Sequence, residues 1–210
     1  MVKNSNSPII YVVDDDISVC RALTLLLKSH GFKVETFTRA KDFLVFKHTK
    51  VPSCLLLDIR LPDIDGLVLQ EKMVLQGINI PIIFITGYGD VPKSVKAIKA
   101  GAIDFFLKPF TSTKLLKSIT LALAESKAKN RKLAEAAKIW RNIKTLSPRE
   151  LEVFRLVVNG MLNKQIATQR GTALQTIKVH RGRVMQKMQA KTVTELIHLA
   201  QKAGVASLQY

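Results

Sequence analysis

Acidic, hydroxyl and ammonium side chains in the first half of the sequence could together carry out phosphoryl chemistry. Carboxylates stand at residues 14–16 and at Asp58, a hydroxyl at Thr86 and an ammonium at Lys108. Grouped carboxylate oxygens suit a hard cation such as Mg²⁺, and a carboxylate oxygen can attack phosphorus to give an aspartyl-phosphate. Phosphoryl transfer otherwise needs positioning and charge neutralisation, which the cation and Lys108 would supply. This chemistry requires a fold that brings the groups together.

The elements that would position these groups are short β-strands alternating with helices. Apolar runs rich in β-branched residues occupy positions 9–13, 33–37, 54–57, 81–85 and 103–107, and the segments between them have helical spacing. This alternation predicts an α/β, doubly wound, five-stranded parallel sheet. Ligand sites in such sheets lie beyond the carboxyl ends of the strands, where the carboxylates, Thr86 and Lys108 stand. One aspartate after a strand is commonly a helix N-cap; Asp16 could take that role or lie at the rim of the site, and we favour the cap.

Positive charge is concentrated in the second half of the chain. The 210 residues carry a formal net charge of +17. Residues 1–125 contain 16 Lys and Arg against 12 Asp and Glu, whereas residues 126–210 contain 17 against 4. Such a field is expected for a polyanion partner, although a basic surface that only aids solubility would give the same counts.

Membrane and metal-thiolate classes are disfavoured by the sequence. No apolar run approaches the ~20 residues of a membrane span. The two cysteines, Cys20 and Cys54, lack metal-ligand spacing and are interpreted as buried thiols of a cytoplasmic protein.

Residues 8–125 resemble the receiver domain of bacterial two-component response regulators. The resemblance rests on VVDDD at 12–16, LDIRLPD at 57–63, FITG at 84–87 and KPF at 108–110, in matching order and spacing. It implies that Asp58 accepts a phosphoryl group from a partner histidine kinase. It also implies that the protein is not an enzyme in the usual sense, since a receiver catalyses only its own phosphorylation and dephosphorylation.

The receiver resemblance implies a metal site. Asp15 and Asp58 would bind Mg²⁺ or Mn²⁺ directly, together with the backbone carbonyl of Arg60, and Asp14 would bind the ion through water. Arg60 and Tyr88 would flank the site at positions that could shield the phosphoryl group from water.

The same resemblance implies a switch. Lys108 would bind the phosphoryl group and form a cis bond to Pro109. Thr86 would move toward the new phosphoryl oxygens, and Phe105 would rotate inward to fill the space that Thr86 leaves. The surface around residues 91–106 would then be remodelled and form a homodimer.

The second half of the chain predicts a helical linker followed by four short helices. Residues 111–144 contain no proline or glycine and favour one long helix, although a broken, flexible linker over 126–144 remains an alternative. Ser147, Pro148 and Glu150 form a helix start signal, and further helices are expected near 163–170, 173–188 and 193–202. Two helices joined by a tight glycine-containing turn in a basic context predict a helix-turn-helix.

Residues 145–210 resemble the LuxR-type helix-turn-helix domain. The matching stretches are LSPRE at 146–150, NKQIA at 163–167, TIKVHRGRVMQKM at 176–188 and ELIHLA at 195–200. With the receiver, they make the chain similar to FixJ-like members of the NarL/FixJ group. Basic and amide side chains on the outward face of the third helix suit phosphates and base edges, although a solvated basic face would show the same pattern. The residues expected to contact DNA are Asn163, Lys164, Gln175, Thr176, Lys178, Val179, Arg181, Gly182 and Arg183.

Three residues at the turn depart from the LuxR-type pattern. That family usually has apolar residues at the positions of Arg170 and Thr172, and a Ser or Thr cap at Ala173. Loss of a cap costs roughly 1 kcal/mol, and we expect Arg170 to extend its stem over the core with its charge in solvent.

Three functions from different classes follow from these features. The first is a phosphorylation-controlled transcription factor with promoter DNA and RNA polymerase as further partners. The second is an enzyme that uses the Mg²⁺–carboxylate cluster on a diffusible substrate, which would leave the basic half unexplained. The third is a DNA-binding protein with a vestigial receiver, which should lack one of the key site residues. We favour the first because Asp15, Asp58, Thr86 and Lys108 are all present.

Overall fold

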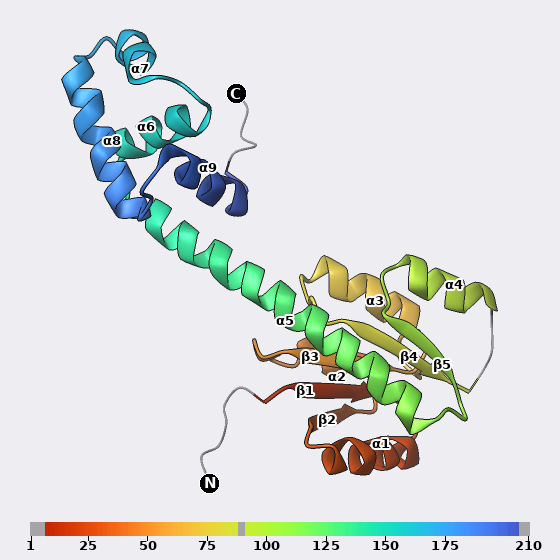
Figure 1. The fold of residues 1–210 in the computed structure, drawn as a ribbon. Helices are drawn as coiled ribbons and strands as arrows, with labels where there is room; N and C mark the ends of the chain where they lie inside the picture. Colours follow the sequence, from red (N-terminus) through yellow and green to blue (C-terminus); the bar gives the residue numbers. More distant parts are fainter. Residues whose placement is uncertain (1–6, 88–90, 206–210) are drawn as a thin grey trace. The chain divides into compact units, whose positions relative to one another are not determined.

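The computed structural model describes residues 7–87 and 91–205, and the chain forms two compact units. The division falls between Asn130 and Arg131. The units are described separately, and Figure 1 labels their helices and strands.

The first unit contains a five-stranded parallel sheet. Its strands are β1 (Ile9–Val13), β2 (Lys33–Phe37), β3 (Ser53–Leu57), β4 (Ile82–Thr86) and β5 (Asp104–Leu107). They are hydrogen-bonded in the order β2-β1-β3-β4-β5, and every pair is parallel. The predicted doubly wound parallel sheet is therefore confirmed.

Helices cover both faces of this sheet. The helices are α1 (Ile17–Ser29), α2 (Ala40–Val45), α3 (Gly66–Leu75), α4 (Val91–Lys99) and the first part of α5 (Ser112–Ile143). One core cluster joins α1 and α5 to the sheet through residues such as Leu27 and Ile119, and the other joins α2, α3 and α4 through residues such as Phe43 and Met73. Burying both faces explains why β3 and β4 are continuous apolar runs.

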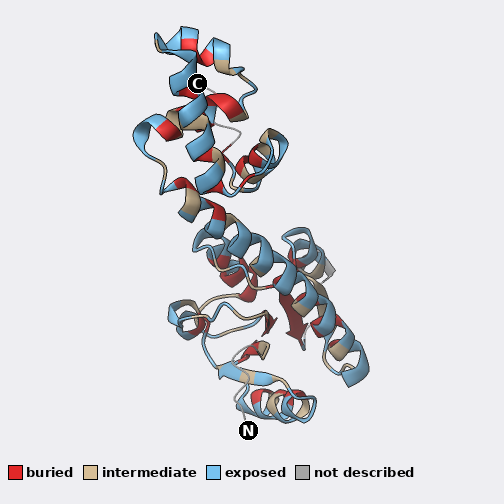
Figure 2. Cartoon of the chain, turned by 60° about the vertical axis from the view of Figure 1, so that its left-hand side comes forward, coloured by how far each residue is buried: buried red, intermediate tan, exposed pale blue. Residues whose placement is uncertain are grey.

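Burial differs between the central and the edge strands. Every residue of β3 and β4 is buried, whereas β2 lies at the edge with exposed and half-buried residues. Figure 2 shows the central strands in red and a largely pale-blue edge strand. The carboxyl ends of β1, β3 and β4 thus emerge from a rigid core, which is what a precisely placed site requires.

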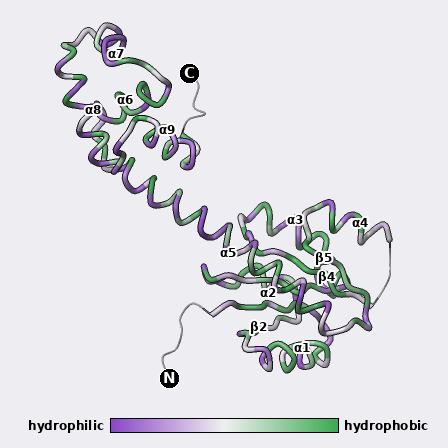
Figure 3. Tube along the Cα trace, viewed as in Figure 1, coloured by the Kyte–Doolittle hydropathy of each residue, from purple (hydrophilic) through white to green (hydrophobic). Residues whose placement is uncertain are grey.

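The second unit is all-α. The end of α5 packs with α6 (Pro148–Val158), α7 (Asn163–Arg170), α8 (Leu174–Met188) and α9 (Val193–Lys202). Phe154, Ile166, Val184 and Leu196 are fully buried in their common core. The expected helices agree with α6 to α9, and Figure 3 shows hydrophilic and hydrophobic residues alternating along α8 as an amphipathic helix requires.

Two helix ends of the second unit have the capping residues that the sequence favours there. Ser147 and Glu150 form a capping box at the start of α6, with Pro148 as its first residue. Gly171 ends α7 in the left-handed conformation at φ 58°, which a glycine adopts without steric cost. Among residues 7–87 and 91–205, no helix is long and apolar enough to span a bilayer.

Candidate functional sites

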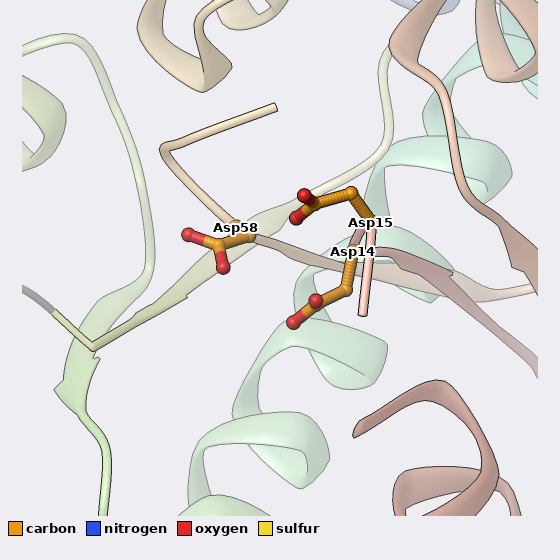
Figure 4. A group of neighbouring side chains, drawn as sticks. All are labelled: Asp14, Asp15 and Asp58. Atoms are coloured by element: carbon orange, nitrogen blue, oxygen red, sulfur yellow. The ribbon is translucent and has the colours of Figure 1, made fainter. Parts of the chain in front are cut away.

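Three aspartates gather at the carboxyl ends of β1 and β3. Val13 and Leu57 are paired in the parallel register, so Asp14 and Asp58 leave neighbouring strands side by side. One carboxylate oxygen from each of Asp14, Asp15 and Asp58 lies within 4.8 Å of the others. Figure 4 shows the three side chains together. Asp14 is 3% exposed and Asp58 9%, while Asp15 lies at the surface.

Lys108 closes this cluster from the end of β5. Its Nζ lies 2.6 Å from Oδ2 of Asp14 and 3.2 Å from Oδ2 of Asp58. Burial lowers the pKa of Lys108, but the hydrogen bond to Asp14 and the charges of both aspartates outweigh burial and raise it. The ammonium is therefore held in its charged form where it can neutralise a phosphoryl group.

Burial raises the pKa of Asp14, whereas it lowers that of Lys108. The pKa of Asp14 is raised because burial disfavours the carboxylate more than the hydrogen bonds from Lys108 and the Asp16 amide favour it. A second positive charge in the cluster would stabilise the ionised form of this carboxyl.

The carboxylate of Asp58 is held by groups on two sides. The Arg60 amide donates to Oδ1 at 3.1 Å, and Lys108 donates to Oδ2. The Asp58 amide donates to the Val13 carbonyl at 2.9 Å, which extends the β1–β3 pairing by one step. A carboxylate anchored in this way keeps lone pairs for a cation or for attack on phosphorus.

The expected switch residues lie on β4 and β5. Thr86 ends β4 and is 1% exposed, and its carbonyl accepts from the Lys108 amide at 2.8 Å. Phe105, on β5, is partly buried with its ring 6.5 Å from that of Phe84. The Lys108–Pro109 bond is cis, as expected, and Tyr88 lies outside the described residues.

Asp16 has the helix-capping role that we favoured. Its side chain accepts from the amides of Ser18 and Val19 at the start of α1. These hydrogen bonds lower the pKa of Asp16. Of the three consecutive aspartates, Asp14 and Asp15 therefore belong to the acidic cluster and Asp16 to the helix.

Gly66 supports the acidic site and was not among the residues expected there. A Cβ at this position would lie 2.5 Å from the carbonyl oxygen of Asp58 and 2.9 Å from Cα of Ile59. The Gly66 amide donates to the Ile59 carbonyl at 2.7 Å. The sequence signal that could have found it is a glycine directly after Asp65, which caps α3.

Asp63 fixes a second helix near the site. It accepts from the amides of Ala40 and Lys41 at 3.1 and 2.9 Å, across 22 or more residues of sequence. Arg39, which precedes α2, makes no side-chain capping bond, since a guanidinium has no acceptor to offer. Asp63 therefore performs this role from the loop after Asp58.

Oxygen chemistry at the cluster fits a hard divalent cation. Carboxylate oxygens and backbone carbonyls are the ligands that Mg²⁺ takes, with water completing its shell. Asp14, Asp15 and Asp58 supply the carboxylates from two adjacent strands. The donor set thus permits a metal site at this edge of the sheet.

The second unit presents a polar helix face. The buried side of α8 consists of Ile177, Val184 and Met188. The opposite side is exposed and contains six of the residues expected to contact DNA, namely Gln175, Thr176, Lys178, Val179, Gly182 and Arg183. Lys164 on α7 is also exposed.

Two other expected DNA contacts are paired with each other. The Arg181 guanidinium donates to Oδ1 of Asn163 at 2.6 Å, and both side chains are partly buried. This hydrogen bond joins α8 to the start of α7. Arg181 and Asn163 therefore hold the two helices together, and we keep their contact with DNA as a prediction.

The expectation for Arg170 was wrong. Its guanidinium is not free in solvent but is partly exposed and paired, 2.7 Å from Oε1 of Glu152 on α6. The side chains of Arg170 and Glu152 are 34% and 27% exposed. A charged partner at this distance satisfies the guanidinium donors more strongly than a neutral acceptor would. Local sequence patterns could not show that partner, because it lies on a different helix.

Family models match both units. The model described as "Response regulator receiver domain" matches residues 10–120, and "Bacterial regulatory proteins, luxR family" matches residues 144–200. Nodulation protein W of Bradyrhizobium diazoefficiens is 43% identical over 207 residues, which cover 97% of this chain and 89% of that protein. The transcriptional regulatory protein FixJ of the same organism is 39% identical, covering 93% and 96%.

Solved structures lead to the same family. The structure of the response regulator StyR is similar with a TM-score of 0.80 and 41% identity, covering 93% of this chain and 99% of that one. Full-length FixJ from B. japonicum has a TM-score of 0.54 and 38% identity, covering 93% and 97%. With a receiver fold, an acidic site and a LuxR-type domain, this chain belongs to the NarL/FixJ family of response regulators that control transcription.

Proposed function

We propose that a partner histidine kinase phosphorylates Asp58, and that phosphorylation promotes dimerisation and sequence-specific DNA binding. The observation that carries this proposal is the position of the Asp58 carboxylate, 3.2 Å from Lys108 and beside Asp14 and Asp15. We assign the receiver to residues 8–125, the linker to 126–144 and the DNA-binding domain to 145–210. The receiver would catalyse its own phosphorylation and dephosphorylation.

A divalent cation, Mg²⁺ or Mn²⁺, would complete the acceptor site. Asp15, Asp58 and the backbone carbonyl of Arg60 would hold it directly, and Asp14 would hold it through water. The cation supplies charge neutralisation for the phosphoryl oxygens. The chain's own groups do the rest: an Asp58 oxygen attacks phosphorus as the bond between phosphorus and the donor, the kinase's histidine or the acetate of acetyl phosphate, breaks, while Lys108 binds and orients the phosphoryl oxygens.

Thr86 and Phe105 would convert phosphorylation into a change of surface. The phosphoryl group adds charge and acceptor oxygens at the sheet edge, which the Thr86 hydroxyl can approach. Phe105 then turns inward, and α4 with β5 becomes the dimer face. Their exposed apolar side chains, Val95, Ile98 and Leu107, support this assignment.

Promoter DNA would be the polyanion partner of the second unit. The exposed side of α8 would enter the major groove, with Lys164 and Asn163 on the backbone. RNA polymerase is the further partner that transcriptional control implies. A regulator that acts on bacterial chromosomal DNA works in the cytoplasm.

The test is DNA binding before and after treatment with acetyl phosphate, for wild type and Asp58→Asn. We expect the wild type to bind promoter DNA at least about 10-fold more tightly after treatment, which corresponds to about 1.4 kcal/mol, and Asp58→Asn not to respond. Asp42→Asn, an exposed aspartate on α2, is the matched control and should respond like the wild type. Equal, strong, sequence-specific binding by all proteins with and without the phosphodonor would reject phosphorylation control.

A further inference from the structure

Carboxylates are scarce in the basic half of the chain, and all four have polar or charged partners. Residues 126–210 contain Glu135, Glu150, Glu152 and Glu195 against 17 cationic side chains. Glu150 belongs to the capping box of α6, Glu195 accepts from the Lys191 amide, and Glu135 lies beside Lys202 and Arg131. Glu152 differs from these in that it and its partners line one hollow with Thr176 of α8.

Glu152 is bound by two arginines at once. Its Oε1 lies 2.7 Å from the Arg170 guanidinium, and its Oε2 lies 3.3 Å from that of Arg149. The Arg149 side chain is 78% exposed, so its ion pair is weak. Arg170 is only about one-third exposed and joins the end of α7 to α6, so its pair is better shielded from water.

These three side chains line a hollow that reaches the start of α8. The hollow has a volume of about 320 Å³, and Thr172, Thr176 and His180 also line it. Thr176 is exposed and is one of the residues that we assign to DNA contact. The two guanidinium groups therefore lie close to the start of α8, where we expect contact with DNA.

A guanidinium at such a place would strengthen binding to any DNA. Contacts to phosphate carry no sequence information directly, and each adds to the salt-dependent, non-specific part of the affinity. A carboxylate that occupies the guanidinium groups would remove that contribution and leave base readout to α8.

We propose that Glu152 limits the sequence-independent affinity of the DNA-binding domain, because it pairs with Arg170 and Arg149 and keeps their guanidinium groups from DNA phosphates. This inference rests on the proposed role of α8 in DNA recognition. Arg170 replaces the apolar residue that LuxR-type domains usually have, so Glu152 and Arg170 act together in this chain. Arg149 contributes less because its pair is exposed.

The test compares full-length Glu152→Gln with the wild type on two duplexes at several salt concentrations. One duplex is enriched from a random library by phosphodonor-treated wild type, and the other is a scrambled version of it. We expect Glu152→Gln to bind both duplexes about 3- to 10-fold more tightly, and its salt dependence to be steeper by about 0.9 for each additional phosphate that the variant binds. The ratio of affinities for the two duplexes should stay near the wild-type value, because a phosphate contact strengthens binding to both.

Two further variants separate release of the guanidinium groups from folding and from net charge. Glu135→Gln makes the same charge change at a carboxylate that also lies between two cations, and it should keep the wild-type affinities and salt dependence. In Glu152→Gln/Arg170→Gln the wild-type salt dependence should return in large part. Melting temperatures of all variants, measured in parallel, report folding.

Different outcomes would overturn the role of Glu152 and the proposed DNA-binding function. Unchanged affinities and an unchanged salt slope in Glu152→Gln would overturn the role of Glu152, as would parallel losses on both duplexes together with a lower melting temperature. If Glu135→Gln changed affinity and salt dependence as much as Glu152→Gln does, net charge alone would explain the effect, and the role of Glu152 would be overturned as well. If the wild type enriches no duplex and does not prefer one, the proposed DNA-binding function fails, and this inference fails with it.

Discussion

At the scale of single residues, the proposed acceptor site combines two nearly buried carboxylates with one ammonium that compensates both. Asp14 and Asp58 are nearly buried, and both contact the Lys108 ammonium. Burying one carboxylate alone is unfavourable, so the lysine compensates two aspartates at once. The same lysine is placed to bind the phosphoryl group, which would draw it away from Asp14.

Gly66 provides a prediction at this scale. In Gly66→Ala the new Cβ meets backbone atoms of Asp58 and Ile59, at 2.5 and 2.9 Å, which cannot move like a flexible side chain. We expect a loss of about 1–3 kcal/mol in the free energy of unfolding. Because Asp58 must shift, phosphorylation by acetyl phosphate should slow about 10- to 100-fold.

Urea denaturation and the rate of phosphoprotein formation would measure these two effects of Gly66→Ala. A Gly66→Ala variant with wild-type stability and phosphorylation rate would show that the start of α3 shifts to accommodate the new methyl group without displacing Asp58. In that event Gly66 would have no role in positioning Asp58.

At the scale of elements, polar side chains at helix ends determine how short helices attach. Ser147 and Glu150 start α6, and the Glu150 carboxylate also lies 2.6 Å from the Lys187 ammonium at the end of α8. Asn163 and Arg170 connect the two ends of α7, a helix of 8 residues, to α8 and α6. Such contacts matter most where a helix buries few side chains. In α7, whose eight residues are all described, Ile166 and Ala167 are the buried ones.

Glu150 provides the prediction at this scale. The hydrogen bond from Lys187, followed by that from the Ser147 amide, lowers the pKa of Glu150 to about 2 from an ordinary 4.5. A depressed pKa means that the ionised side chain stabilises the fold fully above pH 4.5, and that this contribution disappears as the pH falls toward 2. Glu150→Gln should therefore lower the free energy of unfolding by about 2 kcal/mol at pH 7 and by much less near pH 2.

Thermal unfolding from pH 7 down to the lowered pKa would measure the Glu150 effect. Glu195→Gln is the matched control, since Glu195 has the same third position after a capping residue on α9, and its carboxylate accepts there from the Lys191 backbone amide. A pH-independent difference between wild type and Glu150→Gln would contradict the electrostatic explanation.

At the scale of the whole molecule, phosphorylation of one domain has to change the behaviour of the full chain. We expect a monomer to become a dimer through α4 and β5, where Val95, Ile98 and Leu107 are 46–49% exposed. Ile98→Asp should abolish the dimer by placing a charge in an apolar contact, while phosphorylation of Asp58 continues.

Sedimentation with and without beryllofluoride, a phosphoryl mimic, would test this dimer. Val74→Asp, on α3 at a side chain that is 72% exposed, is the control and should dimerise like the wild type. An unchanged mass for the wild type in both conditions would contradict phosphorylation-dependent dimerisation.

Local sequence patterns predicted most of the secondary structure of this protein. The strands, the four helices of the second unit and the capping box agree with the structure, because burial periodicity and cap chemistry are properties of neighbouring residues. The placement of Asp14, Asp58, Thr86 and Lys108 at one sheet edge also followed, since parallel strands bring their carboxyl ends together.

Side-chain partners that lie far apart in sequence were decided only by the tertiary structure. Arg170 pairs with Glu152, Asn163 with Arg181, and Gly66 lies against the backbone of Asp58. No periodicity encodes such pairs, because the partner of a side chain depends on how whole helices pack and not on its neighbours along the chain. The sequence alone thus indicated which side chains could carry out phosphoryl chemistry, and the packing of α3 against Asp58 and of α6 and α7 against their neighbours decided what holds that site and α8 in place.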